Sequence, residues 1–117
     1  MLTIRSTDQV IYLVVDGEIK KEDLNHAAST IEQEVVQQNK VRLLIEITAL
    51  EGYDSVSAFL KDSSETIKHY RDFSKIAIVA KEEWLSSLSS FTDLINPATI
   101  KHFAPREKAV AEEWIKQ

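Results

Sequence analysis

The sequence predicts an α/β domain built around a mostly parallel β-sheet, and two observations support this prediction. Three apolar runs stand out, at residues 10–15, 41–47 and 76–80, and each is nearly continuous in hydrophobic side chains. A strand that is buried on both faces has this pattern, whereas a half-exposed strand alternates. Between the runs, apolar residues recur at helical spacing, which is typical of parallel strands joined by crossover helices.

The first two expected elements form a hairpin. Residues 2–5 alternate apolar and polar, and the turn-forming sequence Thr7-Asp8-Gln9 precedes the run at 10–15. We therefore expect a half-exposed edge strand antiparallel to a buried one. Asp16-Gly17 ends the buried strand, and a helix over 22–38 follows. Its apolar residues fall on one face: Leu24, Ala27, Ala28, Ile31 and Val35.

Two further strand–helix units follow. Residues 42–47 form the next expected strand, and Asp54 is the N-cap of the helix after it. Residues 75–80 form a third buried strand, followed by a helix that stops before Pro97.

The chain ends with a short strand over 99–103 and a helix whose first position is Pro105. The order is ββαβαβαβα, a single domain over 1–117 with five strands. The expected buried stripe of the last helix is Ala109, Val110 and Trp114. The expected core comprises Leu13, Val15, Leu44, Ile45, Ile78 and Val79, with Trp84 and Trp114 largely buried against it.

Composition excludes several classes of protein. The chain has 117 residues, the size of one ordinary domain, and its 44% hydrophobic and 28% charged residues are typical of a globular protein. It has no cysteine, which excludes disulfide frameworks and thiol catalysis. A net charge of −5 without clustered Lys and Arg disfavours nucleic acid as a partner. We expect a cytoplasmic protein without a membrane span, because the apolar runs are short and no signal-peptide pattern is present.

No constellation for catalysis stands out in the sequence. His26, His69 and His102 fall on separate expected elements, without the spacing that aims two ligands at one metal ion. Gly17 and Gly52 are isolated, so no phosphate-binding glycine loop is present. We therefore expect no enzymatic activity, no metal and no cofactor.

Several local motifs follow one another in a characteristic order. They are Gly17-Glu18-Ile19 with Glu22-Asp23, Glu51-Gly52-Tyr53, Ile76-Ala77-Ile78-Val79 with Trp84-Leu85, and Phe103 followed by Ala109 and Trp114-Ile115. Together they resemble the SpoIIAA-like family, whose relatives are the STAS (anti-sigma-factor-antagonist) and Sec14-type lipid-binding domains. Lys20 and Ala104 depart from the family pattern, since each stands where a helix cap is common. The resemblance implies a mixed sheet with an antiparallel first edge strand, and no established enzymatic activity.

In STAS relatives, a serine at the start of the helix after the third strand is phosphorylated by a partner kinase. The matching region here is the candidate partner surface, made of Glu51, Gly52, Tyr53, Asp54, Ser55 and Ser57. Ser55 is a candidate phosphoacceptor, because the N–H groups of a helix N-terminus accommodate a phosphate. However, Asp and Ser are also ordinary helix-starting residues, and Asp54 would repel the added charge. We therefore favour protein docking over a phosphorylation switch.

Two classes of function stay open. The first is a regulatory, protein-binding module that docks its partner at residues 51–57. The second is a carrier of a small apolar ligand or lipid, related to Sec14-type domains, with a cavity lined by residues such as Phe59, Leu88 and Phe91. A cavity of a few hundred Å³ distinguishes the carrier from the filled protein-binding domain. The edge strand at 2–5 is also open to pairing with a second copy, which predicts a homodimer.

Overall fold

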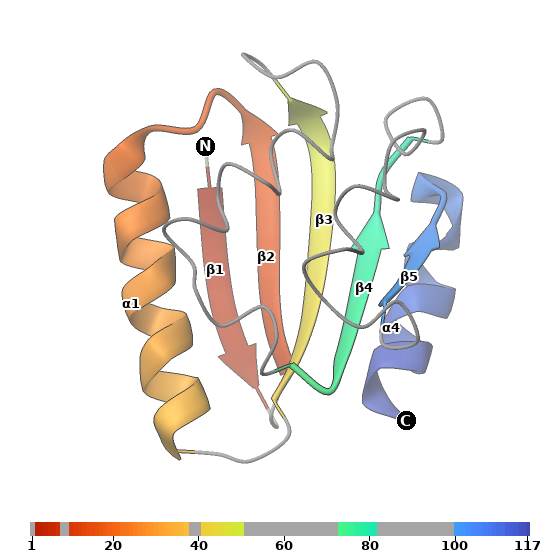
Figure 1. Cartoon of the computed structure of the whole chain (residues 1–117). Coiled ribbons are helices and arrows are strands. Elements are labelled where there is room, and N and C mark those ends of the chain that lie inside the picture. Colours follow the sequence, from red (N-terminus) through yellow and green to blue (C-terminus); the bar gives the residue numbers. More distant parts are fainter. Residues whose placement is uncertain (1, 8–9, 38–40, 51–72, 82–99) are drawn as a thin grey trace.

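The computed structural model describes residues 2–7, 10–37, 41–50, 73–81 and 100–117 (Figure 1). Within these residues, five strands form one sheet in the order β1-β2-β3-β4-β5. Their bounds are β1 Leu2–Thr7, β2 Val10–Gly17, β3 Arg42–Leu50, β4 Lys75–Val79 and β5 Ile100–Phe103. β1 is antiparallel to β2, and every other neighbouring pair is parallel. The predicted mixed sheet with an antiparallel edge strand is confirmed.

Two helices cover opposite faces of this sheet. α1 (Lys21–Gln37) connects the parallel strands β2 and β3 and packs near β1, on the left of Figure 1. The short 3₁₀ helix η4 (Pro105–Glu107) leads into α4 (Lys108–Lys116), which contacts β3, β4 and β5. The helices predicted after the strands at 42–47 and 75–80 lie outside the described residues.

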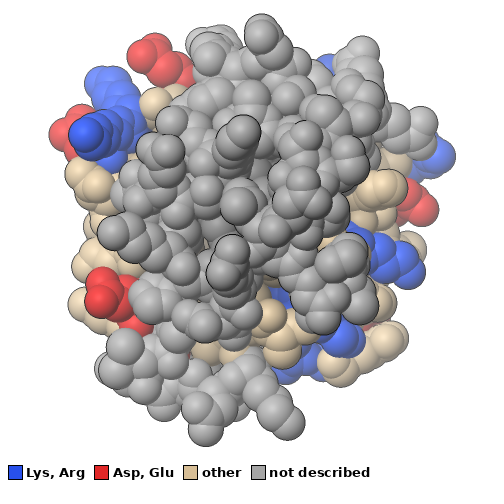
Figure 2. Space-filling model, viewed as in Figure 1, with Lys and Arg blue, Asp and Glu red and all other residues tan. Residues whose placement is uncertain are grey.

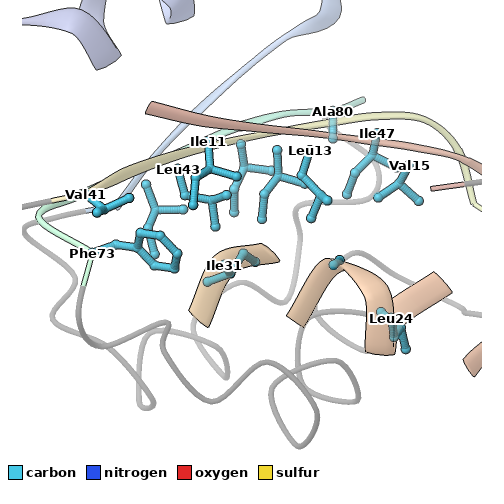
Figure 3. Close-up of a cluster of buried hydrophobic side chains, with 14 residues drawn as sticks. Ile11, Leu13, Val15, Leu24, Ile31, Val41, Leu43, Ile47, Phe73 and Ala80 are labelled. Atoms are coloured by element: carbon cyan, nitrogen blue, oxygen red, sulfur yellow. The ribbon is translucent and has the colours of Figure 1, made fainter. Parts of the chain in front are cut away.

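The first half of the core lies between the sheet and α1. Alternate residues of β2 and β3, including Ile11, Leu13 and Leu43, reach toward this helix, where Leu24 and Ile31 lie (Figure 3). Leu2 and Ile4 of β1 pack against the same cluster and are partly buried. β1 therefore has one apolar face and one solvent face, as an edge strand with an alternating sequence should.

The second half of the core lies on the opposite face of the sheet, under α4. The buried residues there are Val10, Tyr12, Leu44, Ala77, Val79, Phe103, Ala111 and Ile115. Consecutive residues of a strand point to opposite faces, so a strand with both faces covered buries every side chain. This explains the continuous apolar runs, and the six predicted core residues at positions 13, 15, 44, 45, 78 and 79 are confirmed as buried.

The predicted buried stripe of the last helix is wrong. Ala109 is exposed, and Val110 is 56% exposed, whereas Ala111 and Ile115 are fully buried. Ala109, Val110 and Ala111 are adjacent in this helix. The sequence is therefore compatible with a buried face that contains Ala109 and Val110 and also with one that contains Ala111 and Ile115. After the 3₁₀ turn of η4, α4 has Ala111 and Ile115 packed against the sheet.

Trp114 is half-buried rather than largely buried. Its ring packs against Phe103 with a centroid distance of 5.9 Å. The Nζ of Lys75 lies 4.9 Å from the Trp114 ring centroid, and the Nζ of Lys101 lies 5.9 Å from it. The indole ring therefore covers the edge of this part of the core, and the two lysine ammonium groups lie over the ring as cation–π contacts. Trp84 lies outside the described residues.

Candidate functional site

The predicted partner surface begins directly after β3. Its six residues, Glu51, Gly52, Tyr53, Asp54, Ser55 and Ser57, lie outside the described residues. The structure does describe the strand that carries them. β3 pairs with β4 only as far as Glu46, opposite Val79, but continues beside β2 to Leu50. The carboxyl ends of β2 and β3 therefore project beyond β4, and β3 ends at Leu50, the last described residue before the predicted partner surface (Figure 1).

The projecting end of β2 and β3 has an irregular backbone. The register between the strands shifts between Val15 and Asp16, and Gly17 has a φ of 86°, a left-handed conformation that glycine adopts without strain. Thr48 Oγ1 donates a hydrogen bond to the main-chain oxygen of Val15 across the two strands, at 3.2 Å. The side chains of Asp16, Glu18 and Thr48 are exposed here. This end of the sheet thus combines a hydrogen-bonded framework with exposed polar and acidic groups.

A pocket lies at the opposite end of the sheet, where the sequence analysis placed no site. Its volume is about 270 Å³, and its lining includes Thr7, Val10, Tyr12, Arg42 and Lys116. Val10 and Arg42 are the first residues of β2 and β3 and lie in register with each other. The hollow is called the amino-edge pocket below, because it lies at the amino ends of these parallel strands.

Two cations next to this pocket donate hydrogen bonds to main-chain oxygens at the C-terminal end of α4. Arg42 Nη1 donates to the main-chain oxygen of Gln117 at 3.0 Å. Lys75 Nζ donates to the main-chain oxygens of Trp114 and Gln117, at 3.2 and 2.9 Å. The last carbonyls of a helix have no partner within the helix and carry partial negative charge, so cations are favoured there. The amino ends of β3 and β4 therefore fix the position of the C-terminal end of α4.

Lys116 lines the pocket and Arg5 contacts the lining residue Tyr12, and neither side chain has a described hydrogen bond to the end of α4. The guanidinium of Arg5 lies 4.4 Å from the centroid of the Tyr12 ring, a cation–π contact across the β1–β2 hairpin. Lys116 has no ion pair within the described part of the chain and is exposed. The described lining of the pocket therefore includes two cations, Arg42 and Lys116.

This pocket has no local signature in the sequence because its lining comes from β1, β2, β3 and the last turn of α4. No local motif joins residues as distant as Thr7 and Lys116. One signal was present in the sequence: a hairpin pairs Arg5 with Tyr12, and the structure has these two residues directly opposite each other. The approach of α4 to this hairpin is a tertiary feature without a sequence pattern.

The described histidines do not converge. His26 lies on α1, which packs near β1, whereas His102 lies on β5 at the other edge of the sheet. The described residues contain no group of three or more His, Asp or Glu side chains that could hold a metal ion. Acidic and basic side chains both occur around the rim of the face shown in Figure 2. No helix within the described ranges is long and apolar enough to cross a membrane.

The fold defines the class of this protein as a single α/β domain with a five-stranded mixed sheet and an antiparallel first edge strand. A family model described as SpoIIAA-like matches residues 10–116, and the chain belongs to this SpoIIAA-like family. A similar solved structure is an uncharacterized DUF3478-family protein with a SpoIIAA-like fold from Shewanella loihica PV-4. The two are 21% identical with a TM-score of 0.58, and the match covers 98% of this chain and 92% of the other. No curated protein matches the chain significantly.

Proposed function

We propose that this SpoIIAA-like protein is a regulatory, protein-binding module without enzymatic activity. Its docking surface is the segment of Glu51, Gly52, Tyr53, Asp54, Ser55 and Ser57. The observation that supports this proposal is the projection of β2 and β3 beyond β4, because the segment follows directly in the sequence after Leu50, the last residue of β3. Ligands of parallel sheets generally bind beyond the carboxyl ends of the strands.

The chemistry of the segment suits a protein partner. Tyr53 supplies a large aromatic side chain, the type that carries most of the binding energy in protein interfaces. Glu51 and Asp54 add negative charge. Asp16, which pairs with Ala49 near the end of β3, and Glu18 are exposed acidic residues at the carboxyl end of β2. The partner surface that fits this segment is therefore basic around an apolar pocket for the tyrosine.

In this proposal Ser55 belongs to the docking surface and does not act as a phosphorylation switch. A phosphate on Ser55 would lie beside the Asp54 carboxylate, and like charges at this distance repel. Docking therefore does not depend on phosphorylation of Ser55.

The alternative function is a carrier of a small apolar ligand or lipid. Such a carrier needs a cavity with a mainly apolar lining. The amino-edge pocket has the volume of a small ligand site, but Arg42 and Lys116 line it together with Val10 and Tyr12. This lining suits a charged ligand better than a lipid chain. The residues predicted to line an apolar cavity, Phe59, Leu88 and Phe91, lie outside the described residues. Native mass spectrometry of freshly purified protein tests the alternative, which predicts a retained apolar molecule.

Site-specific crosslinking followed by calorimetry tests the proposed function. A photoreactive phenylalanine analogue at position 53 should crosslink one protein in cells, and the same analogue at the exposed Val110 of α4 should not. With that partner purified, Tyr53→Ala should weaken binding by about 1–3 kcal/mol, the range of an interface hot spot. Ser55→Ala should leave the affinity nearly unchanged.

Two outcomes contradict the proposal. Equal crosslinking from positions 53 and 110 would mean that residues 51–57 are not the docking surface. Phosphorylation of Ser55 in cells, together with loss of the partner in Ser55→Asp and retention in Ser55→Ala, would establish a phosphorylation switch instead.

A further inference from the structure

The face of the sheet that carries α4 is only partly covered. α4 contacts β3, β4 and β5, and the alternate residues Thr3, Arg5 and Thr7 of β1 remain exposed on this face. The amino-edge pocket lies at the boundary between the covered and uncovered parts, beside the last turn of α4. Its walls therefore come from two layers of the fold, the sheet and the helix.

The described lining of this pocket has a consistent chemistry. Arg42 and Lys116 carry positive charge, Thr7 and Tyr12 carry hydroxyl groups, and Val10 is apolar. No Asp or Glu is among these lining residues, although the whole chain has a net charge of −5. The described side chains that line the pocket thus carry a net positive charge, on a protein that is acidic as a whole.

The hydrogen bonds to the end of α4 use only some of the donors that these positively charged side chains offer. Arg42 uses one N–H group to bond Gln117, and a guanidinium has five N–H donors in a fixed plane. That bond holds the guanidinium in place and leaves donors for a second acceptor. Lys116 has no ion pair among the described residues and does not contribute to this cap through any described hydrogen bond. A guanidinium that is fixed by one hydrogen bond, together with an ammonium group that has no ion pair among the described residues, is suited to binding carboxylate and phosphate groups.

We propose that the amino-edge pocket binds a small organic anion, whose carboxylate or phosphate group contacts Arg42 and Lys116. The apolar body of the ligand then lies against Val10 and Tyr12. The volume of about 270 Å³ is at the lower end of small-molecule sites, so the ligand is compact and has no long acyl chain. This site lies at the opposite end of the sheet from Leu50, where β3 ends, and the inference does not rest on the proposed function.

An NMR titration of the full-length, ¹⁵N-labelled chain tests the site. The probes are benzoate, phenyl phosphate and the neutral benzamide. Either anion should shift the amide resonances of Thr7, Val10 and Arg42, and benzamide should not. Binding of benzoate alone assigns a carboxylate ligand, and binding of phenyl phosphate alone assigns a phosphate ligand. No saturable shift with either anion, or equal shifts with benzamide, would overturn the proposal.

A pair of charge-matched variants shows whether the shifts come from this pocket. Lys116→Gln should raise the dissociation constant of the bound anion about three- to tenfold, because it removes a charge-assisted contact. Lys21→Gln makes the same charge change at the start of α1, on the other face of the sheet, and should leave the constant unchanged. Both lysines are exposed, so both variants should keep the wild-type spectrum. Equal weakening in the two variants would mean nonspecific charge attraction and would contradict the site.

Discussion

Ile78 is among the most constrained single side chains in the described structure. It lies in β4 between β3 and β5, is 0% exposed, and belongs to the cluster that packs under α1. The surrounding strands are fixed by hydrogen bonds on both sides, so the core cannot collapse around a smaller residue. A cavity left at this position should persist and lower the free energy of unfolding.

We predict that Ile78→Ala lowers the free energy of unfolding by about 2–5 kcal/mol, the range for large-to-small changes in a packed core. Urea denaturation followed by circular dichroism measures this change. Ser29→Ala is the control, because Ser29 is exposed on α1, and it should change stability by no more than about 0.5 kcal/mol. A midpoint for Ile78→Ala equal to that of Ser29→Ala would refute the role of β4 in the core.

The starts of α1 and η4 share one feature: the main-chain N–H of the residue before the helix donates to an acidic side chain three positions on. The N–H of Lys20 donates to Asp23 Oδ2 at 3.1 Å before α1, and the N–H of Ala104 donates to Glu107 Oε1 at 2.8 Å at η4. In a complete capping box, a Ser or Thr at the first position also accepts a bond from the residue three positions on. Lys20 and Ala104 lack that oxygen. Each helix start therefore makes only one of the two hydrogen bonds of a capping box, the one from the main-chain N–H to the acidic side chain.

We predict that Lys20→Ser completes the box at α1 and raises the free energy of unfolding. The serine oxygen can accept an N–H in the first turn, a contact typically worth about 0.5–2 kcal/mol relative to alanine. Lys20→Ala removes the same charge without supplying the oxygen, so it separates the cap from the charge effect. Thermal denaturation of the two variants measures the difference, and equal melting temperatures would contradict the cap.

The orientation of α4 gives a second prediction for a helix. Ile115 is fully buried, whereas Val110 is 56% exposed on the same helix. We predict that Ile115→Ala destabilises the protein by about 2–5 kcal/mol, and that Val110→Ala changes stability by less than about 0.5 kcal/mol. Chemical denaturation of both variants measures these values. The reverse order would restore the stripe of Ala109, Val110 and Trp114 that the sequence suggested.

At the scale of the whole molecule, β1 forms one border of the sheet in the described structure. It pairs with β2 on one side, and its other side has no strand partner among the described residues. Unpaired edges are templates for pairing with another chain, although charged side chains oppose it. Arg5 is the charged residue in β1, and its guanidinium lies over Tyr12.

We predict that two copies associate through antiparallel pairing of β1 and form one continuous sheet. Sedimentation velocity over a range of protein concentrations should then show a monomer–dimer equilibrium. Thr3→Lys adds a second cation to the exposed face of β1, and like charges across paired strands are destabilising, so this variant should shift the equilibrium toward monomer. Ser29→Lys adds the same charge on α1 and should not. A wild-type chain that stays monomeric at every concentration would exclude this dimer.

The two candidate sites differ in how far the sequence could predict them. Residues 51–57 were singled out because they are contiguous and follow a recognisable strand. The amino-edge pocket was not, because Thr7, Arg42 and Lys116 approach one another only when the hairpin, β3 and α4 are assembled. Contiguous sites leave a local pattern in the chain, whereas assembled sites depend on packing geometry.

The sequence by itself determined the fold class, the strand positions and the mixed direction of the sheet. These features follow from local rules: a strand covered on both faces needs a continuous apolar run, and a helix needs apolar residues at its own period. Only the tertiary structure decided the strand order, the phase of α4 and the pocket beside Lys116. Each of these features depends on which surfaces bury the most apolar area when the elements pack together. The helical period alone does not choose between adjacent apolar residues such as Val110, which is exposed, and Ala111, which is buried.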